Sequence, residues 1–103
     1  MAKSSKREAS DTLYEAILEL ETLENCKKFF QDLCTVAELR AMEQRFNVAI
    51  LLSEGMIYND ILERTGASSA TISRVNRSLQ YGADGYQKVL PIIKERMKKN
   101  GEL

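Results

Sequence analysis

Large apolar residues recur every three or four positions along much of the chain, and this spacing places them on one face of an α-helix. The first such stripe lies in a predicted helix from Asp11 to Leu23. No segment alternates apolar and polar residues over enough positions to indicate a half-buried strand. The pattern therefore predicts an all-α protein made of five to six short helices.

Capping residues divide the first half of this pattern into separate helices. Thr22 or Asn25 can cap a second helix. The segment TVAE, from Thr35 to Glu38, has the pattern of a capping box, in which each side chain bonds the backbone N–H of the other residue. A third helix follows and ends near Gly55, because a residue without a Cβ suits the left-handed position just past a helix.

The second half of the chain has the pattern of a helix-turn-helix. A short helix from Tyr58 to Thr65 ends at Gly66, which tolerates the positive φ that the turn requires. A second helix begins at Ser68 or Ser69 and runs to about Leu79. The apolar residues with suitable spacing to lock the two helices together are Ile61, Ala67, Ile72 and Val75.

The formal net charge is zero, but the charges are unevenly distributed. Residues 1–63 carry seven basic and twelve acidic side chains, whereas residues 64–103 carry eight basic and three acidic ones. No acid lies between Arg64 and Tyr81, while the segment from Glu8 to Glu24 has six acids and no basic residue. A polyanionic partner would therefore meet the second half of the chain and not its first helix.

The outer face of helix 69–79 is small and cationic once its apolar residues face inward. Small side chains at a helix start allow close approach to base edges, and serine and threonine donors at a helix N-terminus suit phosphate contacts. This favours a protein that reads the major groove of double-stranded DNA. Ordinary helical hairpins show the same sequence pattern. A helical protein-interaction or dimerisation module without DNA binding therefore stays open as the alternative.

Several other function classes lack the residues that they need. The chain has no histidine, no glycine-rich loop after a strand and no nucleophile with a nearby base, so we expect no enzymatic activity. Cys26 and Cys34 come without a CxxC motif, which argues against a zinc site or a disulfide. No apolar run reaches the roughly 18 residues of a membrane span. We expect a cytoplasmic protein with no membrane partner and no required cofactor or metal.

Residues 51–79, LLSEGMIYNDILERTGASSATISRVNRSL, resemble the corresponding stretch of the tryptophan repressor of enteric bacteria. The shared features are the paired leucines, the glycine that ends the preceding helix, the Gly-Ala turn and the ATIxR start of the recognition helix. The stretch is especially similar to Trp-repressor-like proteins of the YerC/YecD type. The resemblance implies a single all-helical domain over residues 1–103, an intertwined homodimer and a transcriptional regulator, in our expectation a repressor, that binds pseudo-palindromic operators.

The same resemblance implies which residues face DNA. Carried over by matching position, they are Tyr58, Asn59, Ser68, Ser69, Ala70, Thr71 and Ser73. Base contacts are expected above all from Ser69, Ala70 and Ser73. Arg77 is added on the basis of its charge and not of the match. A DNA-binding domain that does not dimerise, resembling the C-terminal domain of the replication initiator DnaA, is a second alternative.

The resemblance also raises the question of a co-repressor, because the tryptophan repressor holds its ligand between two arginines and beside a threonine. Thr35 and Arg74 match two of these positions, and Arg45 is the best candidate for the third. Two departures count against tryptophan itself. Val75 replaces a glycine, and one deletion before the paired leucines turns that part of the helix by about 100°, which changes the orientation of Arg45. A small-molecule co-repressor stays open, with tryptophan not favoured as the ligand.

Overall fold

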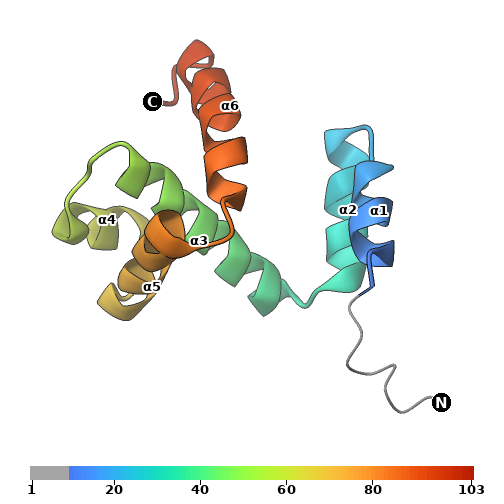
Figure 1. The fold of residues 1–103 in the computed structure, drawn as a ribbon, viewed down its shortest axis with the longest axis horizontal. Helices are drawn as coiled ribbons and strands as arrows, with labels where there is room; N and C mark the ends of the chain where they lie inside the picture. The colour runs from blue at the N-terminus through green and yellow to red at the C-terminus, as the bar shows by residue number, and fades with distance from the viewer. Residues whose placement is uncertain (1–9) are drawn as a thin grey trace. The chain divides into compact units, whose positions relative to one another are not determined.

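A computed structural model of the chain describes residues 10–103, and every regular element within them is an α-helix (Figure 1). The helices are α1 (Thr12–Leu18), α2 (Leu23–Leu33), α3 (Val36–Ser53), α4 (Tyr58–Thr65), α5 (Ser69–Tyr81) and α6 (Gly85–Lys99). None of these helices combines the length and the apolar character that crossing a membrane requires. The prediction of an all-α protein with up to six helices is confirmed.

Contacts within the chain divide its described residues into two compact units, residues 10–39 and residues 40–103. The first unit contains α1, α2 and the start of α3, and the second contains the rest of α3 with α4, α5 and α6. An intertwined dimer would supply contacts that a single chain lacks. Because a single chain does not show such contacts, the expectation of one domain over residues 1–103 stays a prediction.

The first helix is shorter than its apolar stripe predicts. It ends at Leu18 and not near Leu23, because Thr22 adopts an extended conformation and caps the next helix. The Thr22 hydroxyl accepts a 3.1 Å hydrogen bond from the backbone N–H of Asn25, so Thr22 and not Asn25 is the cap. Neither α1 nor α2 buries any residue within the chain. Their apolar side chains are left without cover, as Leu18 (81% exposed) and Leu23 (73% exposed) illustrate.

Both ends of α3 have the predicted local structure. At its start, the backbone N–H of Thr35 donates to Oε1 of Glu38 at 2.8 Å, and the N–H of Glu38 donates to the Thr35 hydroxyl at 3.1 Å. At its end, Gly55 has a φ of 87°, and the N–H of Met56 bonds the carbonyl of Leu51 at 3.1 Å. This bond is typical of a Schellman motif, the helix ending that a left-handed glycine makes possible. The capping box and the helix end are thus confirmed.

The second unit has an apolar core where its four helices meet. Its buried members are Val48, Ala49, Ile50, Leu51, Ile61, Ala67, Ile72, Val75 and Leu90. Phe46 of α3 also stacks on Tyr86 of α6, with ring centroids 6.4 Å apart. Removing an isoleucine side chain from water contributes about 1.5–3 kcal/mol, and Ile61 and Ile72 are both 0% exposed. This core fixes the helix-turn-helix on α3 and α6.

Candidate nucleic-acid interface

The turn between α4 and α5 is held by short-range hydrogen bonds. Gly66 ends α4 with a φ of 73°, and its N–H donates to the carbonyl of Leu62 at 2.9 Å. The Thr65 hydroxyl donates to the carbonyl of Ile61 at 2.7 Å and accepts from the N–H of Ala67 at 3.1 Å. These bonds give the carbonyl groups of Ile61 and Leu62 and the hydroxyl of Thr65 hydrogen-bond partners where α4 ends. The predicted position of Gly66 in the left-handed conformation is confirmed.

The inner face of the helix-turn-helix is the one that the apolar spacing predicts. Ile61 and Ile72 are 0% exposed, and Ala67 and Val75 are 2% exposed. These side chains bring α4 and α5 into direct contact. Because they fix the rotation of α5 about its axis, they also decide which of its residues face outward.

The start of α5 is capped by Ser68. Its hydroxyl oxygen accepts from the N–H of Thr71 at 3.1 Å, and its O–H donates to the hydroxyl oxygen of Thr71 at the same distance. The N–H groups of Ser69 and Ala70 lie in the first turn, where a helix offers them no acceptor. They lie at the positive end of the helix dipole, which attracts anions such as phosphate.

The eight residues predicted to face DNA all lie on α4, α5 or the turn between them. Seven are exposed and Thr71 is half-buried. Ser69, Ala70 and Ser73 form a small outer surface in the first two turns of α5, and Arg77 lies one turn further along. Tyr58 and Asn59 begin α4, where the Tyr58 side chain is 38% exposed. The structure thus gathers these residues on two adjoining helices, and their contact with DNA stays a prediction.

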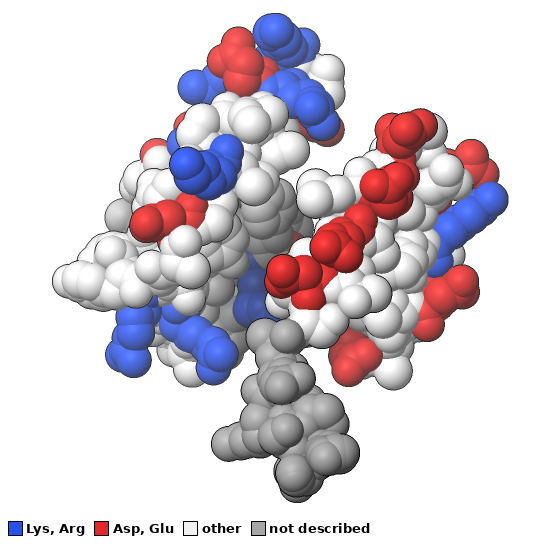
Figure 2. Space-filling view, turned by 45° about the vertical axis from the view of Figure 1, so that its right-hand side comes forward, with Lys and Arg blue, Asp and Glu red and all other residues white. Residues whose placement is uncertain are grey.

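The charges on the two units differ in sign. Figure 2 shows acidic side chains gathered on the unit that contains α1 and α2, where residues 10–39 carry seven acids and two lysines. The second unit, residues 40–103, carries ten basic and seven acidic side chains. Within this unit, the stretch from Arg64 to Tyr81 contains no acidic residue, and it covers all of α5 and the turn before it. The charges therefore favour a polyanion at the stretch from Arg64 to Tyr81 over one at the first unit.

The three residues expected to line a ligand pocket belong to different units and make different contacts. Thr35 belongs to the first unit, where its side chain is engaged in the capping box. Arg45 and Arg74 belong to the second unit, and both are exposed. Val75 is 2% exposed, so its branched side chain is part of the core beside Arg74. The ligand pocket stays a prediction.

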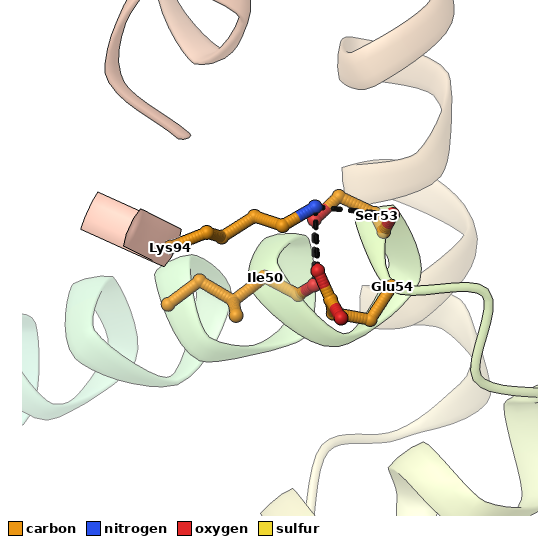
Figure 3. Close-up of polar contacts among 4 residues, drawn as sticks. All are labelled: Ile50, Ser53, Glu54 and Lys94. Carbon is orange, nitrogen blue, oxygen red and sulfur yellow. Dashed lines mark hydrogen bonds and ion pairs between the residues drawn. The ribbon is translucent and has the colours of Figure 1, made fainter. Parts of the chain in front are cut away.

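A lysine of α6 fixes the end of α3 (Figure 3). This lysine is Lys94. Its Nζ atom forms a 2.7 Å ion pair with Oε2 of Glu54 and donates to the carbonyl of Ser53 at 3.3 Å. The Ser53 hydroxyl in turn donates to the carbonyl of Ile50 at 2.7 Å. The hydrogen bond from Lys94 lowers the pKa of Glu54 below its ordinary value, and the charges of Lys94 and Lys98 act in the same direction. A cation here also suits the negative end of the α3 dipole.

Sequence reasoning missed a polar contact that attaches the turn to α3. Nε2 of Gln44 donates to the carbonyl of Thr65 at 3.1 Å, and the two residues are 21 positions apart. Beside this bond lies a hollow of about 440 Å³, whose lining includes Arg40 and Arg64. The one sequence signal for this hollow is Arg64, the residue at which the acid-free stretch begins. Nothing local in the sequence connects it to Arg40 or Gln44.

Comparisons with known proteins agree with this geometry. The sequence profile of a family described as Trp repressor protein matches residues 8–94. The YerC protein of Bacillus subtilis (strain 168) is 51% identical over 85 residues, which make up 82% of this chain and 82% of YerC.

Two solved structures are similar as well. The structure of a candidate Trp repressor from Staphylococcus aureus has a TM-score of 0.80 at 44% identity, covering 91% of this chain and 96% of that one. The structure of a TrpR-like protein from Eubacterium eligens ATCC 27750 has a TM-score of 0.78 at 51% identity, covering 82% of this chain and 87% of that one. The resemblance seen in residues 51–79 is confirmed and extends over most of the chain.

Proposed function

This chain belongs to the Trp repressor family, and we propose on that basis that it is a sequence-specific regulator of transcription that binds double-stranded DNA. In this proposal it acts as a repressor, binds as a homodimer and inserts α5 into the major groove. It needs no metal or cofactor and catalyses no reaction.

The outer face of α5 is the observation that carries the proposal. Its first two turns present Ser69, Ala70 and Ser73, all exposed and none larger than a serine, on a helix without acids. The buried inner face holds this surface outward, so a base edge can approach the backbone of α5 closely. In this proposal these three residues contact bases, while Ser68, Thr71, Tyr58 and Asn59 contact the duplex around them and Arg77 adds a charge contact.

The uncovered apolar residues of the first unit support dimerisation. In α1 and α2 no residue is buried, and Tyr14, Leu18, Leu23 and Leu33 are all at least half exposed. A second copy would cover such side chains, and two-fold symmetry is the commonest closure of a soluble oligomer. In a two-fold dimer two α5 helices can lie about 34 Å apart, one turn of DNA, so that each half-site contributes to affinity.

A small-molecule co-repressor bound by Thr35, Arg45 and Arg74 is a further part of this proposal, and tryptophan is not favoured. The buried Val75 supports this, because its branches occupy core space next to Arg74. Equilibrium dialysis with tryptophan and related aromatic metabolites tests it. No uptake at millimolar ligand would exclude a co-repressor of this class.

Binding to a fluorescently labelled duplex of random sequence, measured by anisotropy over a range of salt, tests the proposed function. A DNA-binding surface predicts a linear fall of log affinity with log salt, with a slope near −0.9 for each phosphate neutralised. The exposed apolar residues of α1 and α2 also suit a protein-interaction module, which would show no duplex binding even at low salt. That result would overturn the proposed function.

A further inference from the structure

The hollow beside Gln44 contains two arginines that lie outside the proposed recognition surface. Arg40 comes from α3 and Arg64 from the last turn of α4. Its other lining residues are Glu43, Gln44, Asn47, Ile50, Leu51, Thr65 and Met97. All of them belong to the unit of residues 40–103. We refer to this feature as the α3–α4 hollow.

The α3–α4 hollow has a fixed position relative to the start of α5. The bond from Gln44 to the Thr65 carbonyl holds the end of α4 against α3, and Gly66 follows directly in its left-handed conformation. Three residues of chain lead from Thr65 to Ser68, so the two positions are at most about 11 Å apart. The lining of the hollow at Thr65 therefore lies within the length of one short segment of chain from the first turn of α5.

The charges in the hollow are not neutralised by ion pairs. Within residues 10–103 the ion pairs are Lys28–Glu24 and Lys94–Glu54, so Arg40 and Arg64 form none there. Both arginines are exposed, and Glu43 is the one acid among the lining residues. Two guanidinium groups can each present a planar pair of donors, which matches the geometry of phosphate oxygens.

We propose that the α3–α4 hollow holds the sugar-phosphate backbone of the bound duplex, with Arg40 and Arg64 on phosphates that border the groove occupied by α5. The inference rests on the proposed function and adds to it a contact with no base specificity. A helix in the major groove has a DNA strand on each side, and contacts to those strands fix its register. The charge of Glu43 weakens this contact without cancelling it.

The salt dependence of binding to a random-sequence duplex tests the proposal. Arg40→Gln and Arg64→Gln are each expected to make the slope of log affinity against log salt shallower by about 0.9, and the double variant by about twice that amount. Arg40→Lys keeps the charge and is expected to keep the slope. Glu43→Gln is expected to strengthen binding to every sequence. The control is Lys88→Gln, an exposed cation of α6 that does not line the hollow and should leave the slope unchanged.

The outcomes separate this inference from the proposed function. If the wild type binds duplex and both glutamine variants keep its slope, the hollow does not hold phosphate and the proposed function stands. If the variants change the preferred base sequence instead of the slope, the arginines read bases and the inference is wrong. If they change the oligomeric state on gel filtration, the hollow belongs to a contact between copies, which also overturns it. If the wild type binds no duplex, both proposals fail together.

Discussion

The side-chain amide of Gln44 donates a 3.1 Å hydrogen bond to the carbonyl oxygen of Thr65, and this bond ties the end of α4 to α3. A helix end leaves carbonyl groups without an intrahelical partner, and Gln44 satisfies one of them in a partly buried place. The same bond forms a wall of the hollow that contains Arg40 and Arg64. The position of the helix-turn-helix on the body of the second unit thus depends on a polar contact as well as on the core.

Gln44→Met keeps most of the side-chain volume and removes the donor. Leaving the partly buried Thr65 carbonyl without its partner is expected to lower the free energy of unfolding by about 1–3 kcal/mol. Urea unfolding followed by circular dichroism measures this. The matched control is Gln80→Met, because the Gln80 amide is exposed and its bond to Asn76 is 3.4 Å long. Equal midpoints for the two variants would show that the bond to Thr65 is not needed.

Gly82 closes α5 in a place where no side chain fits. A Cβ atom at this position would clash with the backbone carbonyl oxygen of Ser78, which is not a flexible side chain that could move aside. Gly82→Ala is therefore expected to destabilise the fold by about 1–3 kcal/mol through the backbone shift that it forces. Gly85→Ala is the control, since a Cβ there meets nothing within 4 Å. Thermal melts that place both variants at the wild-type midpoint would refute the clash.

The ion pair between Lys94 and Glu54 makes stability depend on pH. The pKa of Glu54 is lowered in the folded chain from its ordinary value of 4.5, so the pair stabilises the fold above that pH. This stabilisation is lost as the pH falls through the lowered pKa. The difference in melting temperature between wild type and Lys94→Met is therefore expected to shrink as the pH is lowered from about 7 to about 3.

The control for that comparison is Lys28→Met. Its partner is Glu24 on the same helix, and the two side chains are 67% and 76% exposed. Exposed pairs of this kind contribute roughly 0–1 kcal/mol, so this variant is expected to follow the wild type at every pH. A Lys94→Met curve that runs parallel to the wild type would contradict the role of Glu54.

Ser73→Glu places a negative charge and a longer side chain in the middle of the proposed recognition surface. Because Ser73 is exposed, the melting temperature is expected to stay close to that of the wild type. Specific binding is expected to be lost, since the carboxylate would be repelled by phosphates and would keep α5 from the base edges. The matched control is Gln80→Glu, which makes the same charge change near the far end of α5, where Gln80 is also exposed. Undiminished operator binding by Ser73→Glu would remove α5 from the groove.

The helix-turn-helix and both ends of α3 were parts of the fold that local signals could predict. The bounds of α4, the left-handed Gly66 and the cap at Ser68 follow from residues that act on their immediate neighbours. The end of α1 could not be predicted from its stripe, because apolar spacing continues to Leu20 while the cap at Thr22 already belongs to the next helix. Where two local signals compete, the pattern of apolar residues alone does not decide between them.

The α3–α4 hollow shows the other limit of the sequence. Arg64 comes to lie beside Arg40 and Gln44 because α4 packs on α3 through the core, and no short-range pattern links residues twenty or more positions apart. Asp84, in the link between α5 and α6, has a φ of 70°, a left-handed conformation that aspartate tolerates better than most residues but that its presence in the sequence does not predict. Contacts of this kind follow from the packing of the helices and become visible only in three dimensions.

Selection of bound duplexes from a random pool by the purified protein, followed by sequencing, tests the central claim most directly. If two copies each insert α5 into the major groove, the enriched sequences will share a consensus with two-fold symmetry and half-sites about one helical turn apart. A pool that shows no enrichment, or a consensus without two-fold symmetry, would contradict the account.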